Sequence, residues 1–140
     1  MDRFHHIDPI SNEEVSHINI YLDNTLSDLQ EQLDLHRPIL MIGSAGSFET
    51  FAELQDSEFK PSFERPEQQI DIERFRDISH LIISSTRAER RQMVEIPDVR
   101  VDMIVVATAM TNYILRMCEF KSLKLSAYSL KEGLLFEMLE

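Results

Sequence analysis

A chain of 140 residues, 43% of them hydrophobic, has the length and composition of one globular domain that can bury a core. Its formal net charge of −11 argues against the basic face with which proteins bind nucleic acid. The longest apolar run, residues 103–107, is too short to cross a bilayer, so we predict neither a nucleic-acid nor a membrane partner. The single cysteine, Cys118, cannot form an internal disulfide, and we predict a small core residue in a cytoplasmic protein.

The N-terminal segment is predicted to be an extended lead-in over residues 1–10, followed by a helix. Ser11 and Glu14 have the spacing of a capping box, in which each side chain satisfies a free backbone N–H at a helix start. Apolar residues then recur every three or four positions, which predicts one amphipathic helix over about 12–35 that ends before Pro38. These residues are Val15, Ile18, Leu22, Leu26, Leu29 and Leu33.

A short strand and a glycine-bearing turn come next. Residues 39–42, "ILMI", form a continuous apolar run, which is typical of a strand covered on both faces. After the turn, apolar residues favour a helix that ends at about Gln55.

The middle of the chain is predicted to contain a loop and two helices. Residues 56–69 hold two prolines and many charges, which indicates a loop, and an apolar stripe predicts a helix over about 70–84. Thr86 and Glu89 repeat the capping-box spacing and begin a short basic helix, which Pro97 interrupts.

The last third is predicted to supply the central helix and a second strand. Residues 99–117 are apolar nearly all round, as expected of a buried helix. Residues 122–126, "SLKLS", alternate as a half-buried strand does. Ser129 and Glu132 give a third capping box, and the final helix carries an apolar stripe of Leu130, Leu134 and Met138.

The predicted fold class is α/β, rich in helices, with a small parallel sheet. Each predicted strand lies between helices, which favours parallel pairing, and parallel strands usually belong to a larger covered sheet. Two strands alone leave an open strand edge and uncovered apolar surface. We therefore expect the chain to be part of something larger and to form a homo-oligomer.

The turn after the first strand is the main candidate site. Gly43, Ser44, Gly46 and Ser47 lie where a strand ends and a helix begins, and the free N–H groups of a helix start suit a phosphate. No lysine follows, so the turn is not a P-loop. The alternative is a purely structural turn in which Ser47 is the helix N-cap.

Two further groups are weighed as sites. Arg87, Arg90 and Arg91 form the densest basic cluster, which either contacts an anion or lies on a solvated face paired with acidic residues. His5 and His6 have no companion ligand at a recognised spacing, so a terminal pair is expected and no metal site is assigned. No residue is assigned a catalytic role.

Three stretches, in order and at matching spacing, resemble the Ppx/GppA phosphatase family over about residues 38–136. "GSAGSFETFAEL" resembles that family's Gly-x-x-Gly-Thr turn and the helix after it. "TRAERRQMVEIPDVRVDMIVVATAM" resembles its Glu-Arg segment, proline and Arg-x-Asp before a hydrophobic helix. "LKLSAYSLKEGLL" resembles its closing strand and Leu-Arg-Glu-Gly-Leu-Leu ending. Ser47 stands for the usual Thr, Lys131 for the usual Arg, and Phe48 and Glu49 for small residues.

The resemblance implies a lobe similar to those of the actin and sugar-kinase superfamily. Members of the Ppx/GppA family hydrolyse their substrates in a cleft between two ribonuclease H-like lobes. The resemblance also implies that residues 1–140 are a single domain, the later part of the second lobe, with Gly43, Ser44, Gly46 and Ser47 contacting phosphate. The substrate would be polyphosphate or guanosine pentaphosphate, and a divalent metal, Mg²⁺, would be the cofactor. The family's first lobe, with its Asp-x-Gly-Ser loop and catalytic Glu, and its acidic glycine hairpin are missing here.

This reading makes the chain a fragment of a phosphohydrolase that is inactive alone. The alternative is a non-catalytic module that senses phosphate or a nucleotide, or that only mediates an interaction.

Overall fold

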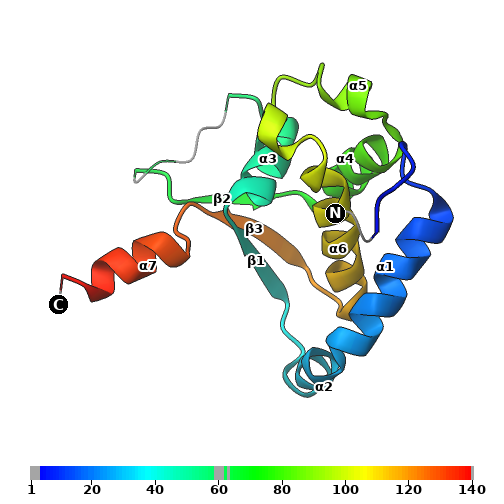
Figure 1. The fold of residues 1–140 in the computed structure, drawn as a ribbon. Coiled ribbons are helices and arrows are strands. Elements are labelled where there is room, and N and C mark those ends of the chain that lie inside the picture. The colour runs from blue at the N-terminus through cyan, green and yellow to red at the C-terminus, as the bar shows by residue number, and fades with distance from the viewer. Residues whose placement is uncertain (1–3, 59–61, 63, 140) are drawn as a thin grey trace.

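The computed structural model describes residues 4–58, 62 and 64–139, and these form an α/β fold (Figure 1). The predicted fold class is confirmed. The elements are α1 (Asn12–Thr25), α2 (Ser27–His36), β1 (Leu40–Ser44), α3 (Gly46–Gln55), β2 (Glu67–Ile70), α4 (Ile72–Ser84), α5 (Arg87–Arg90), a 3-10 turn (Asp98–Arg100), α6 (Met103–Met117), β3 (Ser122–Ser126) and α7 (Leu130–Glu137).

The three strands lie in the order β1-β3-β2. β1 and β3 pair in parallel, from Leu40 opposite Ser122 to Ser44 opposite Ser126, as predicted. The sheet is mixed, however, because β2 pairs with β3 in antiparallel orientation. The sequence prediction of a loop over 56–69 missed β2, since "EQQI" is polar and only Ile70 is buried. Pairing with β3 decides the conformation of this segment.

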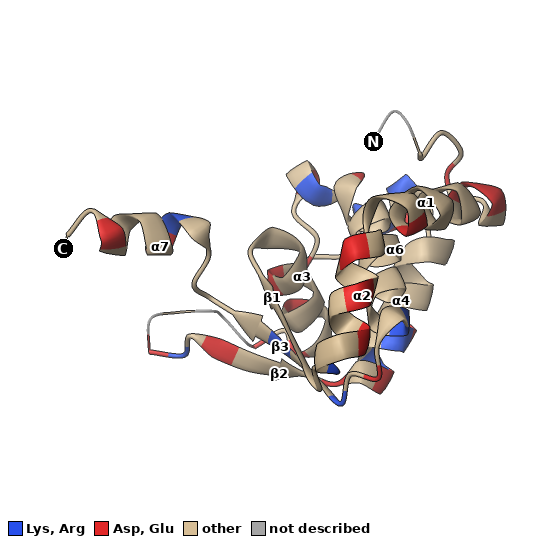
Figure 2. Ribbon diagram, turned by 90° about the horizontal axis from the view of Figure 1, so that it is seen from below, with Lys and Arg blue, Asp and Glu red and all other residues tan. Residues whose placement is uncertain are grey.

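The core lies between the sheet and the helices α1, α3, α4 and α6, which occupy the same side of the sheet (Figure 2). α6 is central to this layer and contacts α1, α3 and α4. The buried apolar side chains come from all of these elements and include Ile18, Phe51, Ile70, Phe75, Ile82, Ile104, Val105, Leu123 and Leu125.

The other face of the sheet is not covered by the described residues. Ile42 is 61% exposed and Leu40 39% exposed, whereas Gly43 of the same strand is buried. The prediction that β1 is covered on both faces is therefore wrong for this chain. α7 leads away from the body and buries no residue, so it does not cover this face (Figure 1).

The predicted helix over 12–35 is two helices, which corrects the sequence prediction. The break is at Leu26, whose φ of −110° and ψ of 21° are not helical. The side chains of Asn24 and Thr25 donate back to the carbonyls of Ile20 and Tyr21, at 2.8 and 2.7 Å. Such bonds compete with the helical backbone, and the sequence "NTLS" places three residues of this kind together.

The helix predicted over 99–117 begins later, at Met103, because Pro97 is followed by the 3-10 turn. Ile104 and Val105 are fully buried, as expected of a central helix. Met103 and Met110 are 59% and 44% exposed, so the helix is not buried all round.

Candidate functional site

The turn between β1 and α3 leaves two backbone donors free. Ala45, with φ 63° and ψ −172°, is the N-cap of α3 and makes no side-chain capping bond. The N–H groups of Phe48 and Glu49 bond to the Ala45 carbonyl at 3.0 and 3.2 Å. Those of Gly46 and Ser47 have no acceptor among the residues that the structure describes. The prediction that Ser47 caps the helix is wrong, because the helix begins one residue before it.

The two glycines of this turn permit close packing. A Cβ at Gly43 would lie 2.1 Å from the Phe48 ring, and a Cβ at Gly46 would lie 2.8 Å from the Arg100 guanidinium. Gly43 is buried, Ser44 is exposed, and Gly46 and Ser47 are half-buried. All four predicted residues therefore lie in one turn, but only part of it faces solvent.

Arg100 holds the start of α3 from the 3-10 turn. Its Nη1 donates to the Gly46 carbonyl at 2.7 Å and to Thr50 Oγ1 at 3.2 Å. Its Nη2 donates to the Glu49 carboxylate at 3.1 Å. The sequence places Arg100 in the Arg-x-Asp segment but does not predict this contact, because 54 positions separate Arg100 from Gly46.

The basic cluster of α5 is paired with acidic groups rather than open to an anion. Arg90 is fully buried, donating from Nη2 to Asp8 at 2.6 Å and from Nε to the Val101 carbonyl at 2.9 Å. Arg87 donates to Asp102 at 2.8 Å. The predicted pairing with acidic residues is confirmed for both, but the predicted solvated position is wrong for Arg90, which is buried. Arg91 is exposed and joins neither pair.

Asp8 ties the N-terminal segment to α5. Burial alone raises the pKa of this carboxyl, but the hydrogen bonds from Arg90 and the Arg87 backbone N–H lower the pKa below its ordinary value of 3.8 overall. The described part of the lead-in, residues 4–10, has turns and bends without a helix or strand.

The histidines of the lead-in contact carboxylates singly. His5 Nε2 lies 3.4 Å from Asp8 Oδ1, and His6 Nδ1 lies 3.4 Å from Glu14 Oε1. Within residues 4–58, 62 and 64–139 there is no group of three or more side chains that could hold a metal ion. Cys118 is half-buried, with Sγ 3.4 Å from the Pro38 carbonyl, rather than in the core.

The turn therefore presents two open N–H donors at a helix start, which suit a phosphate oxygen. Glu49, the only acidic residue in the first turn of α3, is engaged by Arg100. The turn thus offers no free carboxylate to position a water molecule or bind Mg²⁺. No helix in the described part of the chain is long and apolar enough to span a membrane.

A profile of the Ppx/GppA phosphatase family matches residues 1–140. Among solved structures, an exopolyphosphatase from Cytophaga hutchinsonii is 32% identical, with a TM-score of 0.88 over 99% of this chain and 45% of its own. A Ppx/GppA family member from Aquifex aeolicus is 19% identical and shares the fold, with a TM-score of 0.80 over 99% of this chain and 44% of its own. No curated protein matches the sequence significantly. The chain spans less than half the length of these solved relatives, and it belongs to the Ppx/GppA phosphatase family.

Proposed function

We propose that residues 1–140 are the later part of the second, ribonuclease H-like lobe of a cytoplasmic exopolyphosphatase-type phosphohydrolase. In this role the chain supplies one wall of a phosphate or nucleotide cleft. The observation that carries the proposal is the turn at 43–47, where the N–H groups of Gly46 and Ser47 are open at a helix start. Family membership and the 45% coverage of the Cytophaga hutchinsonii exopolyphosphatase support it.

Each residue of the turn has a distinct part in this function. Gly43 admits the Phe48 ring, which sets the direction of α3 against β1. Gly46 and Ser47 donate their N–H groups to a phosphate oxygen, and the exposed Ser44 offers a hydroxyl beside them. Arg100 fixes the Gly46 carbonyl so that the donors stay oriented. Polyphosphate and guanosine pentaphosphate both present such a phosphate.

The chemistry itself is assigned to the part of the relatives that this chain does not span. A carboxylate there would position the attacking water, since the acid beside the turn, Glu49, is ion-paired with Arg100. Mg²⁺, when bound, offsets charge on the phosphoryl oxygens. Its ligands would also come from outside the described residues, which hold no suitable cluster.

A non-catalytic phosphate- or nucleotide-sensing module is the second candidate. The same ion pair favours it, because the turn can bind an anion while no carboxylate beside it is free to act on water. Both candidates bind an anion at the turn, but only the enzyme places a catalytic carboxylate and Mg²⁺ ligands opposite it.

A titration of the ¹⁵N-labelled chain with inorganic tripolyphosphate tests the turn. We expect the Gly46 and Ser47 amide signals to shift. Ser47→Pro removes one open donor at a first-turn position that tolerates proline, and we expect about a tenfold loss of affinity. Ser47→Ala keeps the N–H and should lose about threefold or less.

Equal affinity for wild type and Ser47→Pro would contradict the proposed role of the turn. Shifts at the turn with guanosine triphosphate but none with tripolyphosphate would favour a guanosine nucleotide over polyphosphate as the ligand of the turn.

A further inference from the structure

A second group of cations surrounds two adjoining cavities at the other end of β1. Arg76 and Arg116 line both, and Arg37 and Lys121 line the larger one. The cavities measure about 410 and 990 Å³ and also share Leu115 and Phe120. We call these two cavities together the basic hollow.

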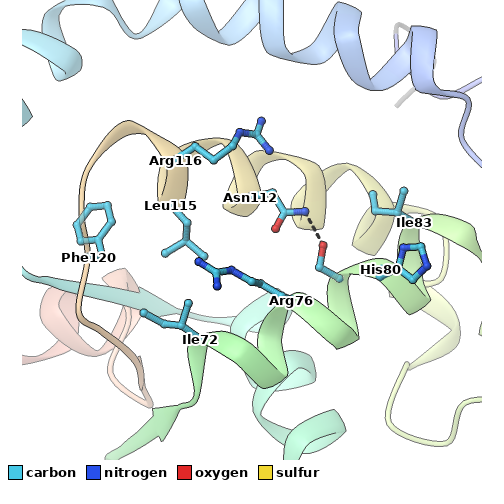
Figure 3. A pocket seen from close by; sticks show the side chains of 9 residues that line it. Ile72, Arg76, His80, Ile83, Asn112, Leu115, Arg116 and Phe120 are labelled. Carbon is cyan, nitrogen blue, oxygen red and sulfur yellow. Dashed lines mark hydrogen bonds between the residues drawn. The ribbon is translucent and has the colours of Figure 1, made fainter.

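The smaller cavity lies between α4 and α6 (Figure 3). Arg76 extends from α4 into the space beside Leu115, whereas Arg116 leaves the last turn of α6 on the side facing α1, where it donates to Asn19. Asn112 and Ser79 bridge the two helices through a hydrogen bond of 2.5 Å. The helices are thus held together where the cavity opens between them.

The charge of the basic hollow is opposite to that of the chain. Acidic residues outnumber basic ones by 25 to 14 overall, yet the lining holds four cations and only two acids, Asp34 and Glu119. Charges of one sign gathered around a cavity focus the potential and attract a counter-charged ligand.

The cations of the basic hollow are only partly neutralised. Arg76 is paired with Glu73 at 2.5 Å, but both side chains are largely exposed, where such pairs are weak. Arg116 donates to an uncharged amide, Asn19, at 3.1 Å. Arg37 and Lys121 have no acidic partner within ion-pair distance among residues 4–58, 62 and 64–139.

Arg37 is held there in an unfavourable backbone conformation. It follows α2 with φ 44° and ψ 58°, in the left-handed region where glycine or asparagine is usual. Its N–H bonds to the Leu33 carbonyl at 2.8 Å. This bond caps the end of α2, and Arg37 then lines the larger cavity.

One wall of the smaller cavity is apolar, although Ser79, His80 and Asn112 also line it. Ile72, Leu115 and Phe120 form a wall of the smaller cavity. A bare inorganic anion gains nothing from such a wall, whereas a flat ring stacks on an aromatic side chain and buries apolar area. The lining therefore fits an anion that carries a ring.

We propose that the basic hollow binds a nucleoside phosphate, with Arg76 and Arg116 on the phosphates and the base against Phe120 and Leu115. Guanidinium groups form strong charge-assisted bonds to phosphate. The site is separate from the turn at 43–47, because the five residues of β1 place the two roughly 16 Å apart. The proposal is independent of the proposed function.

Calorimetry of the 140-residue chain with adenosine triphosphate tests this site, with inorganic tripolyphosphate as the matched ligand that lacks a ring. We expect adenosine triphosphate to bind at least fivefold more tightly than tripolyphosphate at the basic hollow. Arg76→Ala and Arg116→Ala should each reduce the affinity for adenosine triphosphate about fivefold or more. Arg74→Ala, which removes an equal charge from an exposed position of α4 outside the lining, should change affinity less than twofold.

Amide shifts locate the binding and separate it from the turn. The signals of Leu115 and Phe120 should move on addition of adenosine triphosphate, in wild type and in Ser47→Pro alike. No binding at millimolar nucleotide, equal losses in Arg74→Ala and Arg76→Ala, or equal affinity for tripolyphosphate would each overturn the proposal.

Discussion

α4 and α7 have similar sequence features but very different environments. Both begin at a polar N-cap residue, Asp71 in α4 and Ser129 in α7, and both carry apolar residues at helical spacing. α4 buries Phe75, Ile78 and Ile82 against the core. α7 buries nothing, and its Leu134 and Phe136 are 57% and 68% exposed. The comparison shows that local pattern specifies a helix, while its burial depends on a surface that the described residues do not provide for α7.

The two faces of the sheet differ in the same way. One face packs Leu123 and Leu125 beneath the helical layer, and the other leaves Leu40 and Ile42 open. Neither this open face nor α7 is covered by any residue that the structure describes, and the chain covers under half of its solved relatives.

The largest difference in stability is expected when a carboxylate is introduced into the buried helix α6 or into the exposed helix α7. Val105→Asp, in the fully buried part of α6, buries an unpaired carboxylate and should reduce the free energy of unfolding by about 4 kcal/mol. Leu134→Asp in α7 should change it by less than about 0.5 kcal/mol. Urea unfolding followed by circular dichroism measures both. Similar losses for the two variants would show that α7 is packed after all.

A second contrast lies between two neighbouring arginines at the end of α5, Arg90 in its last position and Arg91 just after it. Arg90→Ala leaves Asp8 and two carbonyls without their buried partner and should cost about 3 kcal/mol. Arg91→Ala removes an equal charge from an exposed position and should stay within about 0.5 kcal/mol. If the Arg90 variant unfolds at the same urea concentration as wild type, the buried pair does not hold the N-terminal segment.

The capping boxes of α1 and α7 give a contrast that depends on pH. Burial alone raises the pKa of Glu14, but hydrogen bonds from Ser11, His6 and Ile7 outweigh it and lower the pKa from 4.5 to about 2. Because the folded-state pKa is depressed, ionised Glu14 stabilises the fold above about pH 4.5, and this stabilisation is lost as the pH falls toward 2.

Glu14→Gln should therefore lower the melting temperature by a few degrees at pH 7 and flatten its fall between pH 4.5 and 2. Glu132 also has a pKa of about 2, held down first by Ser129, but it belongs to the unpacked α7. Glu132→Gln should leave the melting temperature of the core unchanged. Scans from pH 2 to 7 test this, and equal effects of the two substitutions would contradict it.

The features predicted correctly from the sequence are local ones. The three capping boxes and β3 are found where the pattern placed them, because they depend on residues within four positions of one another. β2 and the role of Arg100 were missed, since each depends on a partner about 50 or more positions away. For the candidate site, sequence located the turn at 43–47 but not its N-cap, Ala45, whose φ of 63° is unusual for alanine.

The last prediction concerns the oligomeric state of the chain, which we expect to change with no effect on the melting temperature. We propose that the open edge of β1 and the apolar side chains of α7 recruit a second copy of the chain. Light scattering at high micromolar concentration should give about twice the chain mass of 16.4 kDa. Leu134→Glu with Phe136→Glu should restore the monomer without changing the melting temperature, whereas Leu81→Glu on α4 should not. A wild-type monomer would contradict this assembly.

We propose above that this chain supplies one wall of a phosphate cleft and that the groups that carry out hydrolysis lie outside the described residues. Phosphate release from polyphosphate in the presence of Mg²⁺ tests it most directly, using the purified 140-residue chain. The account predicts a rate no higher than that of a heat-inactivated control. Sustained release well above that control, which is abolished in Ser47→Pro, would show that the chain itself contains a complete active site and would contradict the account.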